Sequence, residues 1–139
     1  MKLSRQDKEE LSRIRFEKAR EFLRDAQANV EESRFRTGVN RAYYAALHAI
    51  RSLLVLEGLD SETHSGAITV LSLHFVKPGL LPAEAVKTTK LLLSRRTDVD
   101  YGDFDSITEE EARDSLVRAE ALLDQIGAVR DTITGGSGS

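Results

Sequence analysis

The stretch from Val39 to Leu56, VNRAYYAALHAIRSLLVL, decides the fold. Its apolar side chains recur at the 3.6-residue period of an α-helix, and one set of them falls within an arc of about 120°. That set is Val39, Tyr43, Ala46, Leu47, Ile50, Leu53 and Leu54. Because so wide an apolar stripe is typical of a helix that faces a core, the sequence predicts a central helix over 39–57.

The opposite side of this helix is polar and aromatic over an arc of about 80°: it carries Arg41, Tyr44, His48 and Arg51. A strip of small residues, Ala42, Ala45 and Ala49, lies between the two sides and predicts close approach of another helix. Two interpretations of the polar side stay open. Either its arginines pair with acids of a later helix, such as Glu111 or Asp114, or the side faces a phosphate, which arginine binds with two parallel hydrogen bonds.

Four further helices flank the central one, at about 4–33, 64–77, 82–101 and 108–133. Thr37-Gly38 and Lys77-Pro78-Gly79 are predicted breaks, and Thr108 with Glu111 resembles a capping box. The sequence therefore predicts an all-α, up-and-down antiparallel bundle of about five helices in one domain over 1–134. Residues 135–139 read as a flexible Gly/Ser tail, of the kind that expression vectors add.

Composition excludes several classes of protein. The 139 residues suffice for one domain, and the absence of Cys excludes a disulfide framework and a thiolate metal site. Three scattered His without a close carboxylate argue against structural zinc, so neither a metal nor a cofactor is expected. No apolar run resembles a signal peptide or a membrane span, which predicts a cytoplasmic protein that does not engage a membrane.

Charge is unevenly distributed along the chain. The net charge is -3, but residues 1–32 sum to zero, residues 33–97 to +5 and residues 98–139 to -8. A basic middle segment is suited to a polyanion, whereas the alternative is that these charges pair with one another across the bundle.

Four blocks of the sequence together resemble a known family. They are Asn40–Leu54, Thr63–Gly66, His74–Gly79 and Arg95–Phe104, and their order and spacing resemble the HEPN domain over about 33–126. The resemblance implies a dimeric, cytoplasmic helical bundle of prokaryotic toxin–antitoxin and defence systems. It also implies a minimal nucleotidyltransferase as the antitoxin partner. Many members of the family are metal-independent ribonucleases, whose site is an Arg, four to six intervening residues and a His in a late helix.

This sequence departs from the nuclease motif at the decisive position. Arg96 is followed after four residues by Tyr101, and no His occurs after His74. A tyrosine with an ordinary pKa near 10 is a poor general base at pH 7. The residue types and spacing of the motif also occur at Arg41 and His48, which are separated by six residues. This pair lies in the central helix rather than in the late one. The candidate catalytic residues are accordingly Arg96, Tyr101 and His48.

Candidate RNA- or nucleotide-binding residues are Arg41, Tyr44, Arg51, His64 and Arg95. His64 lies at a predicted helix start, where unpaired backbone N–H groups favour anions, although Thr63 or Ser65 could instead cap that helix. For Arg96 the alternative to phosphate contact is an ion pair with Asp100, four residues on.

The function that the sequence favours is the toxin side of a HEPN–nucleotidyltransferase pair, which binds or cleaves RNA. The alternative is a non-catalytic module that binds a nucleotide or a partner protein. A homodimer is predicted from the alanine strip and from the family resemblance.

Overall fold

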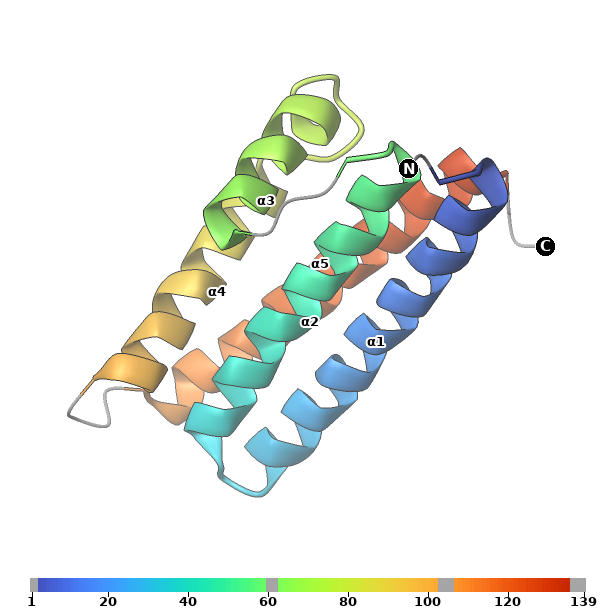
Figure 1. Ribbon diagram of the computed structural model, residues 1–139. Coiled ribbons are helices and arrows are strands. Elements are labelled where there is room, and N and C mark those ends of the chain that lie inside the picture. The colour runs from blue at the N-terminus through green and yellow to red at the C-terminus, as the bar shows by residue number, and fades with distance from the viewer. Residues whose placement is uncertain (1–2, 60–62, 103–106, 136–139) are drawn as a thin grey trace.

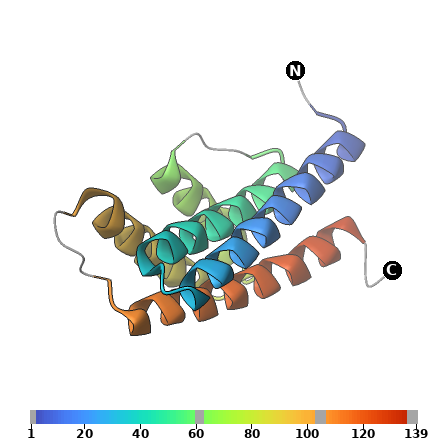
Figure 2. The same cartoon turned by 90° about the horizontal axis from the view of Figure 1, so that it is seen from below.

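The computed structural model describes residues 3–59, 63–102 and 107–135, and this part of the chain is helical and without strands. The elements in order are α1 (Arg5–Glu31), α2 (Phe35–Leu56), α3 (His64–Leu71), the π-helix η1 (Ser72–Val76), α4 (Glu84–Tyr101) and α5 (Glu109–Thr134). The four long helices run alternately up and down (Figure 1), and α3 with α4 lies on the opposite side of α2 from α1 (Figure 2). The all-α bundle predicted from the sequence is confirmed.

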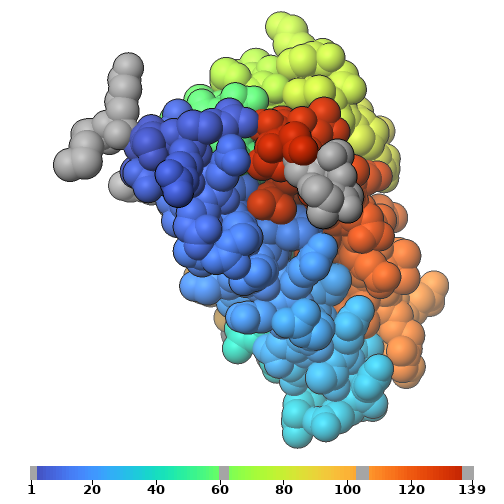
Figure 3. Space-filling view, turned by 90° about the vertical axis from the view of Figure 1, so that its right-hand side faces the viewer, coloured from blue at the N-terminus to red at the C-terminus, as the bar shows by residue number. Residues whose placement is uncertain are grey.

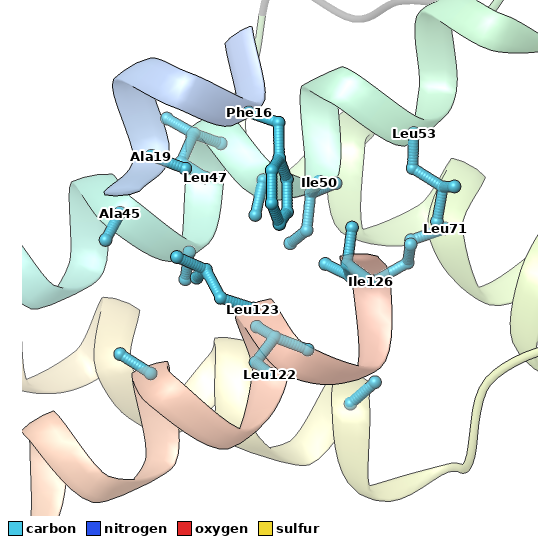
Figure 4. Close-up of a cluster of buried hydrophobic side chains, with 14 of the residues drawn as sticks. Phe16, Ala19, Ala45, Leu47, Ile50, Leu53, Leu71, Leu122, Leu123 and Ile126 are labelled. Atoms are coloured by element: carbon cyan, nitrogen blue, oxygen red, sulfur yellow. The ribbon is translucent and has the colours of Figure 1, made fainter. Parts of the chain in front are cut away.

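The central position of α2 follows from its apolar stripe. Every residue of the predicted stripe is buried, and α2 packs against α1, α4 and α5. Figure 4 shows the resulting core, in which Leu47 and Ile50 of α2 lie among Phe16 of α1 and the side chains of Leu123 and Ile126 of α5. Burial of these side chains supplies the main stabilising free energy, about 1.5–3 kcal/mol for each large one.

The alanine strip of α2 is covered inside the single chain. Ala42, Ala45 and Ala49 are all fully buried, so small side chains here let neighbouring helices of the same bundle approach closely. The inference from this strip to a dimer interface was therefore wrong, and the homodimer prediction rests on the family resemblance alone.

The predicted break at Thr37-Gly38 is also wrong. The chain turns earlier, at Ser33, which has a φ of 64°, and α2 then begins at Phe35. Gly38 lies one turn into α2, where α1 passes so close that a Cβ at this position would overlap the Val30 Cγ2 methyl. Glycine is therefore needed here for a close helix–helix approach rather than for a turn.

The other helix ends agree closely with the sequence. Thr108 caps α5 by accepting a 3.1 Å hydrogen bond from the Glu111 backbone, and Glu111 accepts one of 3.2 Å from the Thr108 backbone, which confirms the capping box. Gly79 has a φ of 92° in the turn before α4. The predicted 64–77 helix is divided, because its last turn is the π-helix η1. Of the predicted tail, residues 136–139 lie outside the described residues.

None of the helices within residues 3–59, 63–102 and 107–135 is both long enough and apolar enough to span a membrane.

Candidate functional site

Arg96 of α4 is the centre of a polar and aromatic cluster where α4, α2 and the first turn of α3 meet. Its Nη2 donates a 2.8 Å hydrogen bond to Tyr44 Oη, and its Nε lies 2.8 Å from Asp100 Oδ2. The guanidinium carbon is 5.5 Å from the ring centre of Tyr44 and 5.8 Å from that of Tyr43. We call Tyr43, Tyr44, His64, Arg96 and Asp100 the Arg96 cluster.

The ion pair between Arg96 and Asp100 confirms the structural alternative that the sequence left open. The two side chains are 17% and 26% exposed, and Asp100 Oδ1 also accepts a 3.2 Å hydrogen bond from Asn40 Nδ2. Burial opposes the charge on Arg96, but Tyr44 and Asp100 favour it, and on balance the pKa of Arg96 is raised. Arg96 is thus a permanent cation in a fixed position, partly open to solvent.

His64 joins the cluster from the start of α3. Thr63 is the N-cap of this helix and accepts a 3.0 Å hydrogen bond from the Gly66 backbone, so the capping role expected of Thr63 or Ser65 belongs to Thr63. The His64 ring lies 5.4 Å from the ring of Tyr43 and 6.4 Å from that of Tyr44. Burial, followed by the charges of Arg96 and Arg51, lowers the pKa of His64. The imidazole is therefore neutral at pH 7 and able to accept a proton.

Tyr101 does not belong to the cluster. Its side chain is 74% exposed at the last turn of α4. Arg96 thus donates a hydrogen bond to Tyr44, whereas Tyr101 acts on Arg96 through electrostatics alone, after Tyr44 and Asp100 in its effect on the pKa of Arg96.

A second polar group lies on α2, on the side that faces α1. Arg41 Nε donates a 2.9 Å hydrogen bond to Asp25 Oδ2 of α1, and Arg41 lies over the Phe22 ring at 5.9 Å. His48 stacks on the same Phe22 ring, with 5.0 Å between ring centres and 7° between planes. Arg41 therefore pairs with an acid of α1 and not, as one interpretation expected, with Glu111 or Asp114 of α5.

Arg95 points to α5 instead of the Arg96 cluster. Its Nη1 is 2.8 Å from Asp114 Oδ2 and 3.0 Å from Ser115 Oγ. Burial raises the pKa of Asp114, but hydrogen bonds from Arg95 and Arg118 outweigh it and the pKa is lowered. Asp114 is thus an arginine partner as predicted, but for Arg95 rather than for an arginine of α2.

A basic depression of about 480 Å³ lies beside the cluster, between the start of α2 and the end of α4. Arg36, Thr37, Asn40, Arg41, Val99 and Asp100 line it. Arg36 donates a hydrogen bond to the Val99 carbonyl, which ties the two helices together. Together with Arg96, these side chains offer guanidinium and amide N–H groups to an anion.

A second depression lies elsewhere on the bundle, and the described residues show no metal-binding group. A depression of about 470 Å³ between α1 and α5, lined among others by Arg20 and Asp124, lies on the face shown in Figure 3 and is apart from the Arg96 cluster. In the described part of the chain, no group of three or more His, Cys, Asp or Glu side chains is placed to hold a metal ion.

One member of the cluster, Tyr43, was not predicted as a site residue. Its place in the apolar stripe predicted a core residue, and the ring is indeed buried, but the hydroxyl has no hydrogen-bond partner among the described residues. The tandem Tyr43-Tyr44 was the available signal: consecutive helical residues are about 100° apart, so a Tyr beside the polar face sits at the border of the core.

His48 yields a prediction about the pH dependence of stability. Burial, with the charges of Lys18, Arg51 and Arg15, lowers the pKa of His48 from 6.5 to about 4. Between these values the unfolded chain binds a proton that the folded chain does not, so stability is complete above pH 6.5 and falls as the pH is lowered towards 4. The partly exposed ring limits the loss to about 1–2 kcal/mol.

The measurement is chemical unfolding of the parent and His48→Gln between pH 7 and pH 4. His48→Gln should lose less stability on acidification than the parent, whereas His74→Gln, on the exposed face of η1, should follow the parent. Equal acid slopes for the parent and His48→Gln would contradict this assignment.

Comparison with known proteins places the chain in a family. The family model of the HEPN domain matches residues 12–129, and the chain belongs to the HEPN domain family. A UPF0332 protein of Thermotoga maritima is 33% identical over 120 residues, which cover 86% of this chain and 91% of that protein.

Two further comparisons agree with this placement. A protein of Methanocaldococcus jannaschii named "Putative toxin MJ0605" is 32% identical over 124 residues, covering 89% of this chain and 91% of that protein. The solved structure of TT1696 from Thermus thermophilus matches with a TM-score of 0.73 at 23% identity, covering 85% of this chain and 97% of that one. The structural match supports the helical fold.

Proposed function

We propose that this protein is the toxin of a toxin–antitoxin pair whose antitoxin is a nucleotidyltransferase, and that it acts on RNA. The observation that carries the proposal is the fixed Arg96 guanidinium, held by Tyr44 and Asp100 at the edge of a depression that also contains Arg36 and Arg41. Membership of the HEPN family and the toxin name of the relative from M. jannaschii support the same role.

The proposed chemistry is phosphodiester cleavage without a metal. Arg96 binds the scissile phosphate and stabilises the charge that develops on it, which is the largest contribution that such a site can make. The ribose 2′-oxygen attacks phosphorus, its proton passes to a base such as the neutral His64, and the bond to the 5′-oxygen breaks as that oxygen takes up a proton from water. The products are a 2′,3′-cyclic phosphate and a 5′-hydroxyl.

The decisive experiment is incubation of purified protein with cellular RNA in excess EDTA, followed by analysis of the fragment ends. Cleavage that persists in EDTA and leaves cyclic phosphate ends is expected, together with growth arrest on expression that a co-expressed nucleotidyltransferase relieves. An Arg96→Ala preparation controls for contaminating nucleases. Fragments of equal yield from both preparations, or none from either, would reject the ribonuclease proposal.

A second candidate is a non-catalytic module that binds a nucleotide or a partner protein. It is favoured by the Asp100 carboxylate, which already pairs with Arg96, and by the Tyr that stands where the late-helix His of the nuclease motif is expected. Nucleotide binding in calorimetry, combined with intact RNA in the EDTA assay, would select this candidate.

A further inference from the structure

Tyr43 carries a buried hydroxyl that nothing in the described part of the chain satisfies. The residue is 0% exposed, and its Oη has no hydrogen-bond partner within residues 3–59, 63–102 and 107–135. Buried polar groups are nearly always hydrogen-bonded, so each exception calls for an explanation such as a bound ion. The charges of Arg96 and Arg51 act on this hydroxyl, which places it on the side of the Arg96 cluster.

Arg96 also has a buried donor that lacks a hydrogen bond among the described residues. Its Nε lies 2.8 Å from Asp100 Oδ2, yet the N–H is not directed well enough at that oxygen to form a hydrogen bond. Two buried donors that form no hydrogen bond with a described residue, Tyr43 Oη and Arg96 Nε, therefore belong to one cluster. Burial raises the pKa of Tyr43 to about 12, so its hydroxyl stays protonated and available as a donor at neutral pH.

Among the other groups around these donors, His64 and Arg51 favour an acceptor with negative charge, whereas the Asp100 carboxylate, 2.8 Å from Arg96 Nε, opposes one. His64, 5.4 Å from the Tyr43 ring, lies in the first turn of α3, where backbone N–H groups lack partners within the helix. Arg51 and Arg96 both lower the pKa of His64 by their positive charge. An oxyanion here would receive hydrogen bonds from Tyr43 and Arg96 and would offset the charge that the two arginines impose.

We infer that Tyr43 Oη, His64 and Arg96 form a binding site for one phosphate group, in which the buried Tyr43 hydroxyl donates a hydrogen bond to a phosphate oxygen. A tetrahedral oxyanion has several acceptor oxygens, which can accept hydrogen bonds from Tyr43 of α2, from Arg96 of α4 and from the single N–H of the neutral His64 ring at the start of α3. The inference deepens the proposed function, on which it rests, by adding Tyr43 and His64, which lie outside the Arg-to-His motif, to the phosphate contact of Arg96.

The test uses the full chain and three probes: inorganic phosphate, adenosine monophosphate and a short RNA with a non-cleavable 2′-O-methyl ribose. Imidazole signals of His64 should shift on addition of phosphate, whereas those of His48 and His74 should not. Tyr43→Phe, which removes only the hydroxyl, should weaken phosphate binding roughly tenfold or more, as expected for a lost hydrogen bond to a charged group. Its thermal unfolding temperature should be unchanged or higher, since none of the described residues loses a hydrogen bond with the hydroxyl.

Several results would overturn the inference. Tyr43→Phe binding phosphate as well as the parent would mean that water satisfies the hydroxyl. No detectable phosphate binding would contradict the site altogether. Shifts confined to the arginine signals of Arg36 and Arg41 would place the anion in the neighbouring depression instead. A preference for the RNA probe over the mononucleotide identifies a phosphodiester as the source of the phosphate, and the reverse preference identifies a nucleotide.

The site and the proposed function can fail separately. If Tyr43→Phe cleaves RNA with the parent's kcat and KM, the subsite is wrong and the toxin proposal stands. If phosphate shifts His64 and Tyr43→Phe abolishes that shift, but RNA is neither bound nor cleaved, the subsite stands and the RNA-acting toxin is wrong. His74→Gln serves as the matched control, because it removes an imidazole that lies outside the cluster.

Discussion

Replacing Arg96 by alanine is expected to lower RNA cleavage by about 100-fold or more, whereas replacing the adjacent Arg95 by alanine should leave it intact. Arg96 is the cation of the cluster, and loss of a group that stabilises transition-state charge typically costs a factor of about 10²–10³. Arg95 is turned to α5, where it binds Asp114 and Ser115. The two residues are neighbours of identical chemistry, so the comparison isolates position.

The stability costs of the two substitutions should be similar. Arg96→Ala loses a partly exposed ion pair and the hydrogen bond to Tyr44, about 1–2 kcal/mol in all. Arg95→Ala loses comparable contacts, while Asp114 keeps its 2.7 Å bond from Arg118. A difference in activity therefore cannot be ascribed to unfolding.

Steady-state cleavage in EDTA, with urea unfolding of each variant, measures both quantities. Arg96→Lys extends the comparison, because lysine keeps the charge but cannot contact Tyr44 and Asp100 with a planar fork. We expect it to be nearly as inactive as Arg96→Ala. Parent-like activity in Arg96→Ala, or equal loss in Arg95→Ala, would remove the Arg96 cluster as the site.

The fold was predictable from the sequence where the signal is local. The apolar stripe of α2 follows from residue spacing within a single helix, and the capping box at Thr108 involves residues three apart. The position of the turn between α1 and α2 was not predictable. A glycine can either end a helix or permit close contact between two helices, and the sequence does not distinguish these two roles. Gly38 reads as a breaker, and only the proximity of Val30 on α1 shows that it permits contact.

The candidate site was predictable only in part, for the same reason. Arg96, Tyr44 and His64 were each singled out, but their meeting depends on where α3 begins relative to α2. The partners of the arginines were misassigned, since Asp25 of α1 faces Arg41 and Asp114 of α5 faces Arg95. Such pairings depend on helix rotation and neighbour order in the bundle. An unsatisfied hydroxyl like that of Tyr43 is likewise visible only once its surroundings are known.

Gly38→Ala is expected to destabilise the protein by about 2 kcal/mol, although alanine is the better helix former by about 1 kcal/mol. The new methyl would overlap Val30 Cγ2, and Val30 is fully buried and β-branched, so its side chain has little freedom to rotate away. Forcing an additional methyl into a closely packed interface typically costs about 1–3 kcal/mol. The thermal unfolding temperature should fall accordingly, by roughly 5–10 °C.

Gly127→Ala in α5 is the matched control for this prediction. Its Cβ would meet only the far end of the Phe16 ring, at 3.2 Å, so a small adjustment of that ring accommodates it and the stability should stay within about 1 kcal/mol of the parent. The cause of the Gly38 effect is tested by adding Val30→Ala. Removing the overlapping methyls should cost less in the Gly38→Ala background than in the parent, with a coupling energy of about 0.5–3 kcal/mol. Additive losses, or a Gly38→Ala variant more stable than the parent, would show that α1 and α2 do not approach through Gly38 as the structure has them.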